Sequence, residues 1–140
     1  MKQIHDYSKN WDFDLDGKAD QVYFIGTRGA HLYFFLRIVL SIDNVERDFP
    51  FIQSDFPILP TDEELKKSEI NLINSLTQFA VFDYDKDNII DIFVRLDNSS
   101  FLSNKKILRK HGVKSNYIII TFRDREAKFR DYSNNSSALN

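Results

Sequence analysis

Two short acidic segments constrain the fold of this chain more than any other feature. Residues 12–20 read D-F-D-L-D-G-K-A-D, and residues 83–91 read D-Y-D-K-D-N-I-I-D. Each segment places carboxylates at its first, third, fifth and ninth positions, where they would repel one another in a folded loop. A hard divalent cation removes that repulsion, because Ca²⁺ takes about six to eight oxygen ligands. The sequence therefore predicts two loops that each wind round a cation.

The expected ligands follow from the alternation of side chains. In such a loop the first, third and fifth side chains point inward, and the seventh residue offers its backbone carbonyl. The ligand sets are Asp12, Asp14, Asp16, the carbonyl of Lys18 and Asp20 in the first loop, and Asp83, Asp85, Asp87, the carbonyl of Ile89 and Asp91 in the second. The sixth position requires an unusual backbone turn, which Gly17 adopts freely and Asn88 tolerates. We expect two Ca²⁺ sites, with weaker binding in the second loop, for which Mg²⁺ is the alternative ion.

These loops differ from EF-hands at the last ligand. An EF-hand has a bidentate Glu at its twelfth position and is flanked by helices. Here the twelfth residues are Tyr23 and Val94, which cannot ligate, and β-branched and aromatic residues follow each loop. Such residues favour strands. We therefore expect each loop to lie between β-strands.

The remaining pattern predicts a mainly β (α+β) fold in a single domain, 1–132, followed by a flexible tail, 133–140. Two related β-hairpin halves, about 11–60 and 78–132, are joined by a Pro-rich loop at 49–60 and a short helix at 62–68. Expected strands cover 22–25, 31–42, 77–82, 89–94, 117–122 and 127–132, with a hairpin turn at 27–30. A second short helix is expected at 105–111, where Gly112 stops it.

Charge is unevenly distributed along the chain, while cysteine is absent. Residues 1–94 carry a formal charge of −8, and residues 95–140 carry +6. The basic C-terminal third is expected to balance the acidic loops as a solvated face; an acidic protein partner or nucleic acid are the alternatives, and nucleic acid is the less favoured of these two. The absence of cysteine excludes disulfides and thiolate metal sites. The longest apolar stretch, 32–42, is too short to span a bilayer, and the N-terminus shows no signal-peptide pattern.

The first loop resembles a known calcium motif. The run from Phe13 to Val22 is similar to the D-x-D-G-x-x-D loop of FG-GAP and VCBS-type repeats, whereas the second loop departs from it with Asn88 and two isoleucines. The resemblance implies hairpin loops that hold Ca²⁺. In size and in its loop-then-hairpin layout, the chain also looks similar to small bacterial lysozyme-inhibitor-like and toxin-immunity proteins.

No catalytic motif accompanies the loops. The three histidines lack zinc-ligand spacing, and the serines lack a nucleophile context. We therefore expect a non-enzymatic, calcium-binding bacterial protein of immunity or inhibitor type that binds and neutralises a toxin or hydrolase. The alternatives are a calcium-dependent module of a surface or adhesive protein, and a metal-dependent hydrolase. Weak calcium affinity would indicate a periplasmic or extracellular location, with the cytoplasm as the alternative.

Overall fold

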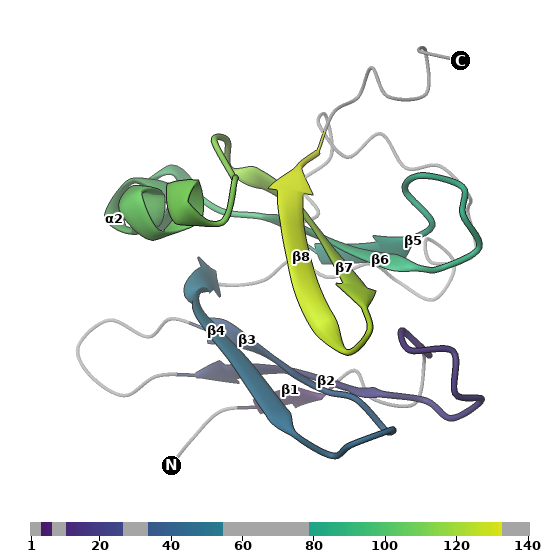
Figure 1. The fold of residues 1–140 in the computed structure, drawn as a ribbon. Coiled ribbons are helices and arrows are strands. Elements are labelled where there is room, and N and C mark those ends of the chain that lie inside the picture. The colour runs from purple at the N-terminus through teal and green to yellow at the C-terminus, as the bar shows by residue number, and fades with distance from the viewer. Residues whose placement is uncertain (1–3, 7–10, 27–33, 55–78, 133–140) are drawn as a thin grey trace.

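The structure, a computed structural model, describes residues 4–6, 11–26, 34–54 and 79–132. Two antiparallel sheets of four strands lie one above the other (Figure 1). The first sheet runs β1-β2-β3-β4, and the second β5-β6-β7-β8. The strands are β1 (Ile4–Asp6), β2 (Gln21–Gly26), β3 (Phe34–Val39), β4 (Glu46–Ser54), β5 (Phe79–Phe82), β6 (Asp91–Arg95), β7 (Tyr117–Arg123) and β8 (Glu126–Asp131). One helix, α2 (Asn98–Lys110), connects β6 to β7. The prediction of a mainly β fold is confirmed.

A single apolar core lies between the sheets. Large side chains alternate along the strands, so that one face of each sheet turns toward the other sheet. Phe24 of β2 meets Phe79 of β5 edge-on, with ring centroids 5.2 Å apart. At the loop end, Phe13 and Phe122 lie 6.0 Å apart. The core therefore connects both halves of the chain and reaches the base of the first acidic loop.

The two halves stack in the same orientation rather than as mirror-like partners. Val22 follows the first loop and faces the core between the sheets. Its counterpart 71 residues later, Phe93, lies on the opposite face of the second sheet, where it packs with Ala80 and Ile119. Tyr84, Tyr117 and other partly buried aromatics pack against that second cluster. Equivalent faces of the two sheets thus point in the same direction.

Several sequence-based boundaries were wrong. Strand β3 ends at Val39 rather than at 42, and β6 begins at Asp91 rather than at 89. The helix begins at Asn98 rather than near 105, because the Asp97 carboxylate accepts a hydrogen bond from the Ser100 N–H at 2.7 Å and caps the first turn. Its end was predicted well, since Gly112 has φ +83 just beyond the last turn.

Strand β4 occupies the start of the segment for which a loop, 49–60, was expected. The register shifts between Phe35, which faces Gln53, and Leu36, which faces Phe49. Pro50 thus falls in an irregularity of an edge strand, which is where a strand tolerates proline. The predicted turn at 27–30, the short helix at 62–68 and the tail lie outside the described residues. Within the described residues, no helix is long and apolar enough to cross a membrane.

Candidate metal sites

The two acidic loops share one backbone conformation. Leu15 and Lys86, at the fourth position, have φ of +58 and +60. Gly17 and Asn88, at the sixth position, have φ of +86 and +70, as the sequence predicted for that position. The left-handed fourth position was not foreseen, because neither Leu nor Lys favours it. The two loops therefore have the same backbone conformation, although their residues differ at the fourth and sixth positions.

Backbone N–H groups within each loop point at the carboxylates. The first carboxylate accepts from the sixth residue: Gly17 donates to Asp12 at 2.9 Å, and Asn88 donates to Asp83 at 2.8 Å. The fifth carboxylate likewise accepts from the seventh residue, at 2.9 Å in the first loop and 3.0 Å in the second. These bonds orient the acidic side chains toward the inside of the loop.

The ninth-position aspartates close the loops. Asp20 is buried and accepts from the N–H groups of Phe13 at 2.6 Å and Ser41 at 2.8 Å. Asp91 is also buried and accepts from the N–H of Tyr84 at 3.0 Å and the hydroxyl of Thr121 at 2.7 Å. Burial raises the pKa of Asp91, although these two donors oppose the shift. Each ninth-position carboxylate therefore ties its loop to a neighbouring segment.

The eight predicted aspartates gather into two groups of four. In each group, one carboxylate oxygen per residue lies within 4.8 Å of the corresponding oxygens of the others. The members are Asp12, Asp14, Asp16 and Asp20 in one group, and Asp83, Asp85, Asp87 and Asp91 in the other. Either group could hold a metal ion. Of the two predicted carbonyl ligands, that of Lys18 faces the Ser41 hydroxyl at 3.4 Å, and Ile89 lies beside a pocket described below.

The first group has the donors and the charge that a hard cation requires. Oδ1 of Asp12 is buried and accepts no hydrogen bond. Burial, followed by the adjacent Asp12 carboxyl, raises the pKa of Asp14 to about 6. The Ser41 hydroxyl, 2.5 Å from Asp16, lowers the pKa of that carboxyl. Among the described residues, no Lys or Arg forms an ion pair with this group. An oxygen-only set of this kind fits Ca²⁺. Arg47, whose direct ion pair is with Asp43, interacts with Asp14 and Asp20 only at longer range.

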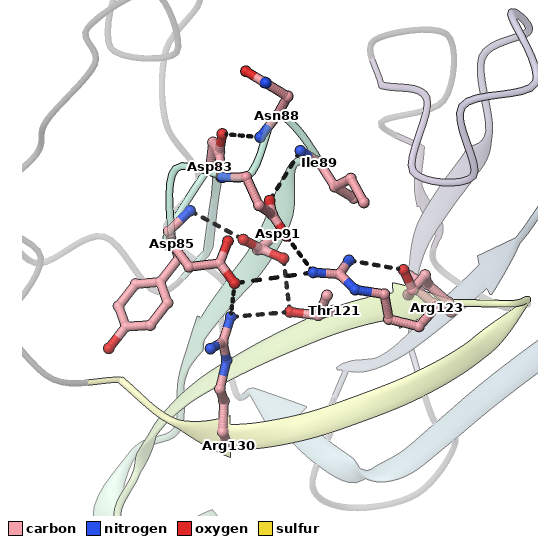
Figure 2. A network of polar contacts seen from close by, with 11 residues as sticks. Asp83, Asp85, Asn88, Ile89, Asp91, Thr121, Arg123 and Arg130 are labelled. Atoms are coloured by element: carbon pink, nitrogen blue, oxygen red, sulfur yellow. Dashed lines mark hydrogen bonds and ion pairs between the residues drawn. The ribbon is translucent and has the colours of Figure 1, made fainter. Parts of the chain in front are cut away.

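Two arginines, one from β7 and one from β8, contact the carboxylates of the second group (Figure 2). Arg130 lies 2.9 Å from Asp85, and Arg123 pairs with Asp87 and lies 3.9 Å from Asp85. Desolvation raises the pKa of Asp87, but the N–H of Ile89 and other contacts, including Arg123, outweigh it and leave that pKa lowered. Reasoning from sequence did not place these arginines in the site. The only signal was the positive charge of the C-terminal third.

A pocket of about 470 Å³ lies at the end of the molecule that carries both loops. Both loops and the turns after β3 and β7 contribute to its walls; the lining residues are Phe13, Asp14, Leu15, Ile42, Ile89, Phe122, Arg123, Asp124 and Arg125. Leu15 and Ile42 are 59% and 51% exposed, as is the nearby Val45 at 51%. Apolar side chains thus protrude at the same end as the acidic groups.

Comparisons of the chain with protein-family models, with curated proteins and with solved structures gave no match. The resemblance to FG-GAP and VCBS-type repeats therefore rests on the loop residues alone.

Proposed function

We propose that this is a non-enzymatic calcium-binding protein in which Ca²⁺ bound by the first loop organises a surface for a protein partner. The observation that carries the calcium proposal is the group Asp12, Asp14, Asp16 and Asp20, gathered without an ion pair to any described Lys or Arg. Bound Ca²⁺ would satisfy the buried Oδ1 of Asp12 and remove the repulsion within the group. Because the apo loop is costly to order, metal binding would contribute directly to folding free energy.

Calorimetry and thermal melting test the calcium site. We expect Ca²⁺ to bind and to raise the melting temperature, and a chelator to lower it. Asp14→Asn should weaken Ca²⁺ binding at least tenfold, because it removes one charged ligand from the group. Asp124→Asn removes an exposed carboxylate in the turn after β7 and serves as the control. Identical melting curves in Ca²⁺ and chelator, with no calorimetric signal, would refute the site.

The partner surface is proposed at the loop end. Leu15 comes from the first loop and Ile42 from the turn after β3, and the N–H of Ile42 donates to Asp14 at 3.3 Å. A cation that fixes the first loop would therefore also fix the exposed apolar side chains beside it. Protruding apolar groups around a charged pocket suit insertion into the cleft of a toxin or hydrolase, which supports an immunity or inhibitor role.

Binding to toxins or hydrolases encoded by neighbouring genes tests this role. A single partner of nanomolar affinity, bound more tightly in Ca²⁺ than in chelator and inhibited on binding, is the expected result. Leu15→Asn with Ile42→Asn should weaken that complex at least tenfold, about 1.4 kcal/mol. The control is Leu102→Asn, which removes a similarly exposed leucine, 66% exposed, from α2 at the other end of the molecule.

Two other outcomes would contradict the inhibitor role. Calcium-dependent adhesion to a surface without one tight partner would favour an adhesive module. Hydrolysis of a phosphodiester or glycoside that is lost in Asp14→Ala would assign catalysis to the first loop.

A further inference from the structure

We infer that the second loop takes no Ca²⁺ of its own, because Arg123 and Arg130 supply the positive charge that its carboxylates need. Calcium binding then belongs to the first loop alone. This inference rests on the proposed function for its account of the first loop, and the experiment below separates the two.

Backbone geometry is closely similar in the two loops. Both have left-handed fourth and sixth residues, and they share one N–H donor to each of the first, fifth and ninth carboxylates. They differ at the fifth N–H, which donates to Asp14 in the first loop and to Asp83 in the second. The spacing of the four carboxylates is also alike. The shared winding thus gives little reason for different metal binding, whereas the residues that surround each loop do.

Two arginine side chains next to the second loop supply positive charge to it. Two guanidinium groups bring two positive charges, equal to the charge of one Ca²⁺. Arg130 Nη2 lies 2.9 Å from Asp85 Oδ2, and Arg123 contacts both Asp87 and, at 3.9 Å, the same Asp85 oxygen (Figure 2). The third- and fifth-position carboxylates, which would be central ligands of a bound ion, are therefore already paired.

Both arginines are held in place by other contacts. The guanidinium of Arg130 lies 4.9 Å from the centre of the Tyr84 ring, and its Nη2 donates to Thr121 at 3.4 Å. Arg123 donates to the Phe122 carbonyl at 3.3 Å. The paired strands β7 and β8 place both side chains next to the loop, and these contacts restrict side chains that are 37% and 43% exposed. A cation entering the loop would have to displace both guanidinium groups.

The corresponding arginine of the first half is directed elsewhere. Arg130 is paired across the sheet with Ile119, and Arg47 is paired in the same way with Ile38, the counterpart of Ile119. Arg47 instead forms an ion pair with Asp43 at 2.5 Å and interacts with Asp14 and Asp20 only at longer range. The first loop therefore lacks the pairing that the second loop has, although an arginine stands at the equivalent strand position.

Calorimetric titration with Ca²⁺ tests the inference. The wild-type chain should bind one ion, and Asp14→Asn should weaken that binding at least tenfold. Adding Arg123→Met and Arg130→Met to Asp14→Asn should restore the binding of one ion, at least tenfold tighter than in Asp14→Asn alone. Methionine keeps the aliphatic bulk while removing the charge. Lys128→Met in the same background, which removes a β8 cation paired with Glu126, should restore nothing.

Each result decides between the alternatives. Two ions bound by the wild-type chain, or no gain of Ca²⁺ binding in the arginine variant, would overturn the inference. No Ca²⁺ binding by the wild-type chain, together with a gain in the arginine variant, would refute the proposed function and leave the inference intact. If the triple variant (Asp14→Asn, Arg123→Met, Arg130→Met) does not fold in chelator, Ca²⁺-dependent recovery of its circular dichroism gives the same readout. If it folds in neither condition, Arg123→Met alone in the Asp14→Asn background is titrated, with the same gain expected.

Discussion

At the scale of single residues, the aspartates were predictable and their partners were not. The alternation of Asp12, Asp14 and Asp16 in the sequence predicts that their carboxylates converge, because a tight loop turns alternate side chains inward. Nothing in the sequence links Ser41 or Arg130 to a loop, because each comes from a distant segment that tertiary packing brings near. The choice between a metal ion and a guanidinium as counter-charge therefore depends on packing.

The pair formed by Asp43 and Arg47 gives a prediction about pH. Arg47, followed by the N–H of Val45, lowers the pKa of Asp43 from 3.8 to about 2. A lowered pKa in the folded state means that the pair stabilises the fold above pH 3.8, and that this contribution is lost as the pH falls toward 2. In chelator, wild type should thus resist urea better than Asp43→Asn at neutral pH, and the difference should shrink below about pH 4.

Urea unfolding of both proteins from neutral to acidic pH measures that difference, with Asp124→Asn reporting the effect of removing an exposed carboxylate. A difference between wild type and Asp43→Asn that stays constant down to the lowest pH would contradict the assignment.

At the scale of elements, local sequence patterns located most strands but placed several helix and strand boundaries wrongly. The strands expected at 77–82 and 127–132 appear as β5 and β8, because apolar and polar residues follow a strand pattern there. Strand β4 was missed because Pro50 suggests a loop, and only the pairing with β3 shows that an edge strand can contain it. The start of α2 was missed because Asp97 was not recognised as its cap.

At the scale of the whole molecule, the repeat was predictable and its stacking was not. An offset of 71 residues relates the loops in the sequence. It does not reveal that Val22 and its counterpart Phe93 lie on differently packed faces, one between the sheets and one on the far side of the second sheet. Stacking in one orientation gives each half a different environment, so that related loops can acquire different counter-charges.

Because one core joins the sheets, Ca²⁺ in the first loop should stabilise the second sheet as well. Trp11, at the start of that loop, packs against Phe79 of β5 with ring centroids 5.7 Å apart, and Phe79 also meets Phe24. At a Ca²⁺ concentration a hundredfold above the dissociation constant, the whole domain should gain about 2.7 kcal/mol. Hydrogen exchange of amides in β3 and β7 should then slow together, and both responses should be smaller in Asp14→Asn at the same Ca²⁺ concentration. Slower exchange confined to the first sheet would mean that the halves unfold separately, and that the ion braces only the half that binds it.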